Sequence, residues 1–167
     1  MKILIISDSH GNIANLKAAM EIGKKAGISA VIHCGDWDDV KSAETVLSYG
    51  IPIYTVLGNA DVDSEIEEFL RFNSKKFDPY FLKIEMGGRK IGVTHRPSDN
   101  RKYFATSLRG DSSKAGLNVI FNGHLHSKYG GEFQGIKVVR PGALINGINF
   151  AIFETETNEA EFVNDEN

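Results

Sequence analysis

Seven side chains that can bind a metal ion fall into five short motifs, and each motif directly follows an apolar segment of the chain. The motifs contribute two aspartates, one asparagine and four histidines, which in chain order are Asp8, His10, Asp36, Asn59, His95, His124 and His126. Open α/β sheets hold their ligands at the carboxyl ends of the strands. We therefore expect the five motifs to meet at one edge of the fold and to form a shared metal site.

The mixture of oxygen and nitrogen donors limits which metals fit. Carboxylate, amide and imidazole groups together suit Mn²⁺, Ni²⁺, Fe²⁺ or Zn²⁺, whereas Ca²⁺ and Mg²⁺ prefer oxygen ligands throughout. Seven ligands are too many for one tetrahedral ion, and a carboxylate can bridge two ions. Two divalent metal ions are therefore expected as cofactors, with Mn²⁺ as the leading choice.

The spacing inside the motifs agrees with this chemistry. Residues i and i+2 of an extended backbone point to the same side, so Asp8 and His10 are expected to face one site. The same rule pairs His124 with His126. Glycine stands just before three of the motif residues, where it permits a tight turn, at positions 35, 58 and 123.

Each motif taken alone has a simpler explanation. Asp8 or Asp36 after a strand could cap the next helix. Asn59 could be a turn residue, and His95 a hydrogen-bonded structural histidine. Helix capping does not require such residues at successive strand ends, whereas metal binding does, so their joint position favours the metal site. The remaining histidine, His33, lies inside a predicted strand and is expected to be structural.

Short apolar runs rich in β-branched residues predict the strands that position these motifs. The runs are too continuous for half-exposed strands, which indicates burial on both faces, and they cover residues 2–7, 30–34, 51–57 and 118–122. Helical patterns separate the first three runs: one begins at Asn12 and stops at Gly27, and another spans about Val40–Ser48. This alternation predicts right-handed βαβ units with parallel strands.

The second half of the chain has a different character. Antiparallel hairpins are predicted around Gly87-Gly88 and around Gln134-Gly135, a helix is predicted over about 100–115, and a strand is predicted near 148–155. Parallel units followed by hairpins favour two packed sheets with helices outside. We expect one domain over 1–167, ending in a solvated acidic tail over about 157–167.

Composition excludes several classes of protein. At 167 residues, with 41% hydrophobic and 25% charged residues, the chain fits one ordinary globular domain. A net charge of −3 argues against extended nucleic-acid binding, which needs many cationic side chains. The single cysteine, Cys34, suits a reducing compartment, and the N-terminal apolar run is too short for a signal peptide or a membrane span. A cytoplasmic protein without a membrane partner is expected.

The series of motifs resembles that of the calcineurin-like metallophosphoesterases, in particular their small uncapped phosphodiesterase branch. The resemblance covers about residues 1–155, with all five motifs in order. It implies a four-layer αββα sandwich, in which two mixed β-sheets are flanked by helices. It also implies two metals that share Asp36: Asp8, His10, Asp36 and His126 would hold the first, and Asp36, Asn59, His95 and His124 the second.

The resemblance further implies hydrolysis of a phosphodiester. The net charge of −3 and the short chain without an inserted cap domain favour a small diester, cyclic or nucleotide-like. A hydroxide between the metals would attack phosphorus in line with the leaving group, so Asp36, Asn59 and His95 would serve catalysis as well as metal binding. Alternatives are a phosphomonoesterase, a nuclease, and a non-catalytic scaffold like the retromer subunit, in which the metal site is degraded. No ligand position is missing here, which favours the enzyme. An uncapped site would leave aromatic surface for a partner subunit, so a homo-oligomer stays open.

Two positions depart from the family pattern. Many larger relatives have His directly after the motif Asn, where it can protonate the leaving oxygen, but this chain has Ala60 followed by Asp61. The small branch commonly lacks this His as well, and such general-acid help is typically worth about 10²–10⁴-fold. After His95 the family usually has Gly, whereas this chain has Arg96. Arg96 is a candidate catalytic residue that would either grip a phosphate oxygen or point into solvent.

Overall fold

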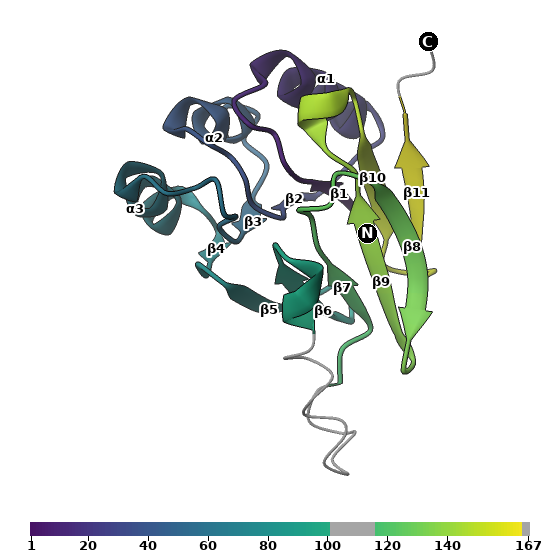
Figure 1. Cartoon of the computed structure of the whole chain (residues 1–167). Coiled ribbons are helices and arrows are strands. Elements are labelled where there is room, and N and C mark those ends of the chain that lie inside the picture. The colour runs from purple at the N-terminus through teal and green to yellow at the C-terminus, as the bar shows by residue number, and fades with distance from the viewer. Residues whose placement is uncertain (101–115, 165–167) are drawn as a thin grey trace.

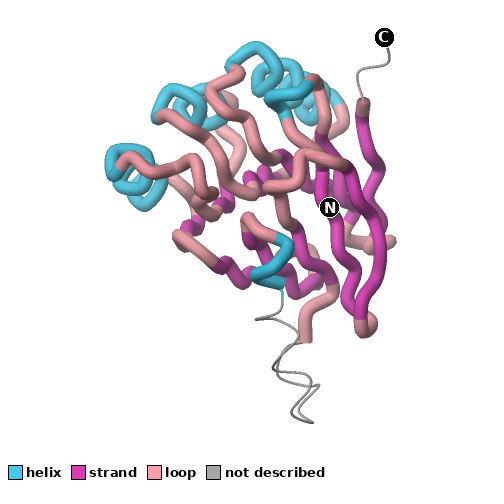
Figure 2. Tube along the Cα trace, viewed as in Figure 1, coloured by secondary structure: helices cyan, strands magenta, loops and turns pink. Residues whose placement is uncertain are grey.

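Two mixed β-sheets pack face to face, and three α-helices cover the outer face of the first sheet (Figures 1 and 2). The structure is a computed structural model that describes residues 1–100 and 116–164. The first sheet has the strand order β11 (Glu159–Val163), β10 (Phe150–Glu154), β1 (Lys2–Ile6), β2 (Ala30–His33), β3 (Ile53–Thr55) and β4 (Lys76–Phe77). The second has the order β5 (Phe81–Met86), β6 (Arg89–Thr94), β7 (Val119–Phe121), β9 (Ile136–Pro141) and β8 (Lys128–Phe133).

The predicted alternation of strand and helix in the first third of the chain is confirmed. Strands β1, β2 and β3 run parallel, with α1 (Ile13–Lys25) and α2 (Val40–Leu47) between them. The Asn12 side chain caps α1 by accepting a hydrogen bond from the backbone N–H of Asn15 at 3.1 Å. Gly27 follows the end of this helix with φ +78°, a left-handed conformation that favours glycine.

The two predicted hairpins are also confirmed. β5 pairs with β6 and β8 pairs with β9, both antiparallel, while β6, β7 and β9 run parallel in the middle of the second sheet. Short 3₁₀ turns follow β6 and β9, at Pro97–Asn100 and Leu144–Asn146. The helix predicted over about 100–115 falls on residues 101–115, which lie outside the described residues.

The third helix, α3 (Ser64–Asn73), was not predicted. Asp63 caps it by accepting a hydrogen bond from the backbone N–H of Glu65 at 2.9 Å, but only Ile66 and Leu70 are fully buried on its inner side. Its apolar residues recur at helical spacing, but four of its ten residues are charged, so the segment carries little apolar signal. In the described part of the chain, no helix is long and apolar enough to cross a lipid bilayer.

Two buried apolar layers hold the sandwich together. One lies between the sheets, where Phe121 of β7 and Phe153 of β10 meet edge to face at 5.1 Å between ring centroids. The other lies between the first sheet and the helices, where Leu4 and Ile6 of β1 pack against Leu16 of α1. Strand β1 is therefore buried on both faces, as its continuous apolar sequence predicted.

The acidic tail expected over about 157–167 is corrected in part. Residues Glu159–Val163 form β11, an edge strand that pairs antiparallel with β10. Ala160 and Phe162 pack against the core between the sheets, while Glu159 on the alternate side binds Lys137 at 2.6 Å. The acidic residues thus belong to one face of a half-buried strand.

Candidate metal centre

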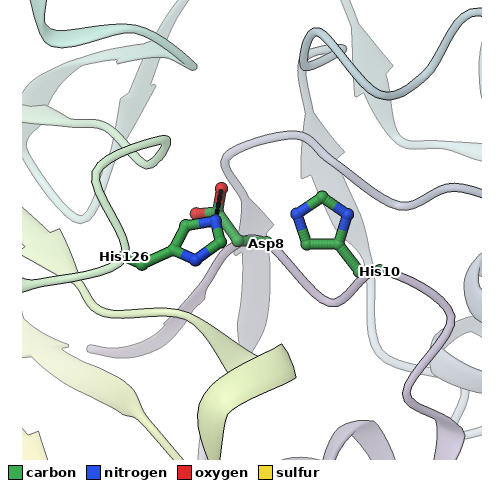
Figure 3. A group of neighbouring side chains, drawn as sticks. All are labelled: Asp8, His10 and His126. Atoms are coloured by element: carbon green, nitrogen blue, oxygen red, sulfur yellow. Dashed lines mark ion pairs between the residues drawn. The ribbon is translucent and has the colours of Figure 1, made fainter.

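The five motifs lie at one edge of the sandwich because each follows a parallel strand at its carboxyl end. The strands are β1, β2 and β3 of the first sheet and β6 and β7 of the second. Their loops bring six ligand residues into two groups, and the ligand atoms within each group lie within 4.8 Å of one another. The first group is Asp8, His10 and His126 (Figure 3), and the second is Asp36, His95 and His124.

Asp36 joins the two groups. Its Oδ2 atom lies 3.5 Å from His10 Nε2 in the first group and 3.3 Å from His95 Nε2 in the second. The amide oxygen of Asn59 lies 3.1 Å from the same His95 nitrogen, which places this residue beside the second group. All seven predicted ligands therefore converge, and one carboxylate lies where it can reach two ions.

The backbone reaches this arrangement through left-handed conformations, not through extended ones. The φ angles are +52° at Asp8, +43° at His10, +60° at Asp36, +70° at His124 and +56° at His126. Each costs a non-glycine residue on the order of 1 kcal/mol, and such residues cluster at functional sites, where the surrounding structure enforces them.

This backbone corrects the reasoning from residue spacing. Asp8 and His10 face one group, whereas His124 and His126 face different groups of the same centre, which is the division that the resemblance implies. The i, i+2 rule requires extended backbone, which these loops do not have. The left-handed turns separate the two imidazoles and aim one at each group.

Glycines at the motif starts allow close approach of neighbouring loops. A Cβ atom on Gly123 would lie 1.9 Å from the Oγ of Ser7 and 2.7 Å from an Asp8 carboxylate oxygen. A Cβ on Gly58 would lie 2.0 Å from Asp36 Oδ1. Because Gly123 has no side chain, the backbone N–H of His124 can approach Asp8 and donate to both of its carboxylate oxygens at 3.1 Å.

Two histidines are oriented by acceptors behind them. The Nδ1–H of His95 donates to the carbonyl oxygen of Cys34 at 2.8 Å, and the Nδ1–H of His10 donates to the Asp38 carboxylate at 3.1 Å. Because a carbonyl or carboxylate can only accept, each Nδ1 carries a proton and Nε2 of each ring faces the Asp36 carboxylate. Burial lowers the pKa of His95, but the hydrogen bond to Asp36 and the charge of that carboxylate outweigh burial and raise it. A metal ion would displace any proton on these Nε2 atoms, and the neutral imidazole is then its ligand.

The carboxylates fit bound cations. Asp8 is fully buried and Asp36 is 2% exposed, yet within the described ranges their only ion-pair partners are histidines, with no lysine or arginine within 4.0 Å. Burial raises the pKa of Asp8. Burial would also raise the pKa of Asp36, but hydrogen bonds from His95 and from the Ala60 N–H outweigh it and hold that pKa at about 2. Divalent ions would neutralise this buried charge.

The His124 ring is suited to a cation for the opposite reason. Burial lowers its pKa, and the neighbouring charges of His95 and Arg96 lower it further. A metal ion must displace any proton on its ligand nitrogen, so it binds more readily to a ring that is already neutral. The residue types and the burial of this centre therefore agree with a site for two divalent ions.

Asp61 was missed as a site residue. Its buried carboxylate accepts four backbone hydrogen bonds at 2.7–2.9 Å, from the N–H groups of Asp36, Trp37, Asp38 and Gly58. Burial raises the pKa of Asp61, against the effect of these donors. The carboxylate ties the loop after β2 to the loop after β3, and so it fixes Asp36 relative to Asn59. The preference of Asp for accepting backbone N–H groups in turns was the available signal.

His33 and Arg96 lie outside the two ligand groups. The His33 ring is buried and stacked on Trp37 at 3.5 Å, with Nε2 3.1 Å from the Ser9 hydroxyl, in keeping with the structural role expected for it. Arg96 is exposed, and it lines a cleft together with Asn59 and His95. Its side chain is therefore beside the centre and in contact with solvent.

We expect the Asp61→Asn variant to bind Mn²⁺ about 10–100-fold more weakly than the unmodified protein, because an amide NH₂ would face backbone donors and loosen the Asp36 loop. Isothermal titration with Mn²⁺ measures this. Asp63→Asn is the matched control, since Asn caps a helix as well as Asp does. Equal Mn²⁺ affinities in both variants would contradict the positioning role of Asp61.

Comparison with known proteins agrees with this centre. The family model of the calcineurin-like phosphoesterase superfamily domain matches residues 1–158. Over 166 residues the chain is 28% identical to phosphodiesterase MJ0936 of Methanocaldococcus jannaschii, which covers 95% of this chain and 96% of that protein.

Solved structures give the same fold. A structure described as a novel archaeal phosphodiesterase has a TM-score of 0.82 and 24% identity, with 98% of this chain and 99% of that chain covered. YfcE, a phosphoesterase from E. coli, has a TM-score of 0.67 and 15% identity, with 98% of this chain and 99% of that chain covered. Because the family model matches residues 1–158 of this 167-residue chain, the chain belongs to the calcineurin-like phosphoesterase superfamily.

Proposed function

We propose that this protein is a metal-dependent phosphodiesterase with a dinuclear metal site. The observation that carries the proposal is the buried Asp36 carboxylate, which lies between two groups of metal-binding side chains. When bound, the two ions would supply the attacking hydroxide between them and neutralise charge on the phosphoryl oxygens. Membership of the superfamily, and the similarity to a relative named as a phosphodiesterase, support this class of reaction.

The side chains divide this work. Asp8, His10 and His126 would hold the first ion with Asp36, while Asn59, His95 and His124 would hold the second with the same carboxylate. Mn²⁺ is the ion we propose, with Ni²⁺, Fe²⁺ or Zn²⁺ as alternatives, because the donors combine oxygen with imidazole nitrogen.

Ala60 and Arg96 influence the choice of substrate. The Ala60 side chain cannot donate a proton to the leaving oxygen, so esters with a good leaving group would react fastest. Arg96 would hold a phosphoryl oxygen from the open side of the centre.

The net charge of −3 supports a small substrate over nucleic acid, and the single buried Cys34 agrees with a cytoplasmic location.

The reaction is tested by loading metal-free protein with Mn²⁺ and measuring hydrolysis of bis-p-nitrophenyl phosphate beside p-nitrophenyl phosphate. We expect metal-dependent turnover that is faster on the diester. Asp36→Asn should reduce it to the metal-free background, because the shared ligand loses its charge. Asp39→Asn is the matched control, since Asp39 only caps α2 and Asn caps equally well.

Other outcomes would point to other functions. Faster turnover of the monoester would indicate a phosphomonoesterase. Turnover that needs a long nucleic acid would indicate a nuclease. Bound metal without turnover of either nitrophenyl ester would contradict the proposal and favour the non-catalytic scaffold.

Arg96→Ala should lower kcat/KM for the diester about 10–100-fold, because a hydrogen bond to a charged group is worth about 1.5–3 kcal/mol. Arg96→Lys should recover part of the loss, since a lysine keeps the charge but not the bidentate geometry. Lys90→Ala, at the opposite end of β6, serves as the control. An unchanged kcat/KM in Arg96→Ala would show that this side chain only points into solvent.

A further inference from the structure

A cleft of about 340 Å³ opens beside the second ligand group. This volume lies at the lower end of the range for small-molecule sites. Its lining includes Asn59, His95 and Arg96 of the centre together with Leu57, Pro79 and Tyr80. The cleft therefore joins the proposed phosphate position to a surface that is partly apolar and aromatic.

The backbone of Tyr80 is held in place by several contacts. Its N–H donates to the Asp78 carboxylate at 2.9 Å, and its carbonyl accepts from the Thr94 hydroxyl at 3.4 Å. β5 and β6 pair Phe81 with Thr94, so one further step of this register puts Tyr80 opposite His95. The aromatic residue is thus anchored next to a proposed metal ligand.

A second tie links this segment to the loop that carries Asn59. The N–H of Leu57 donates to the carbonyl of Pro79 at 3.3 Å. The Tyr80 side chain nevertheless stays 73% exposed. An exposed aromatic ring on an anchored backbone can stack on a flat ligand.

The polar residues around the cleft complete its chemistry. Arg96 forms no ion pair with any residue in the described ranges, so its guanidinium is free to bind phosphate. Three carboxylates also line the cleft: Asp61, Asp99 and Glu67. The Asp61 carboxylate accepts backbone N–H groups, whereas Glu67 can accept hydrogen bonds from hydroxyl or amino groups, although one of its oxygens binds Arg71 at 2.5 Å. A flat ring, hydroxyl groups and a phosphate together are the features of a nucleotide.

We propose that this cleft binds the nucleoside group of a phosphodiester substrate, with the base stacked on Tyr80 and the phosphate between Arg96 and the metal centre. This inference rests on the proposed phosphodiesterase function and adds the class of substrate. Stacking of a base on an aromatic side chain is expected to change affinity by about 10-fold or more. The preference should therefore depend on the ring of Tyr80 and on the presence of a base.

The test compares two probes that share the ribose phosphate and differ in carrying either a base or a hydroxyl group at C1 of the ribose. Binding of adenosine 5′-monophosphate and of ribose 5-phosphate to the Mn²⁺-loaded full chain is measured by isothermal titration. We expect the nucleotide to bind about 10-fold more tightly. In Tyr80→Ala the ratio of the two affinities should fall towards one, whereas Tyr80→Phe should keep it. Phe72→Ala, another exposed aromatic position, at 77%, should also keep it.

The ratio separates the two proposals. Tight binding of ribose 5-phosphate with no gain from the base, or a gain that survives in Tyr80→Ala, would overturn the nucleoside cleft and leave the phosphodiesterase standing. Failure of both probes to bind, together with no turnover of bis-p-nitrophenyl phosphate, would overturn both. Failure of both probes to bind in a protein that does turn over the diester would overturn the cleft alone.

Discussion

A buried carboxylate shared by two sets of imidazoles is the constraint on which this structure depends. Asp36 is 2% exposed, and its Oδ2 lies 3.3–3.5 Å from a histidine nitrogen on either side. Isolated charge in such a place is costly, so its surroundings must supply compensating groups. Ala60 N–H binds Oδ1 at 2.8 Å, and the carboxylate of Asp61 fixes the Asp36 backbone. The remaining positive charge would come from the two ions.

The sandwich explains how residues far apart in the sequence reach this point. Five parallel strands from two sheets end at one edge, and each delivers a short loop. Several ligands in these loops have left-handed backbone, which local sequence does not favour. Packing of the apolar layers offsets that cost, because the strand ends cannot move independently of Phe121, Phe153 and the rest of the core.

Much of this arrangement could be predicted from the sequence. Continuous apolar runs indicated β1, β2 and β3, and Asn12 and Gly27 marked the limits of α1. Polar residues at successive strand ends indicated the candidate ligands, which the fold brings together. These signals are local and repeat along the chain, so each one supports the others.

Other features depend on contacts that spacing cannot express. His124 and His126 separate because their φ angles are left-handed, which an i, i+2 rule does not anticipate. Asp61 acquires its role only when the loops after β2 and β3 come together. In β11, the glutamates concealed the alternation of Ala160 and Phe162, which pack against the core once β10 is beside them.

The most direct test of the shared carboxylate is an anomalous difference map from crystals of the Mn²⁺-loaded protein. Two peaks are expected, one beside Asp8, His10 and His126 and the other beside Asn59, His95 and His124, with Asp36 coordinating both. A single peak, or two peaks of which Asp36 contacts only one, would contradict the dinuclear centre.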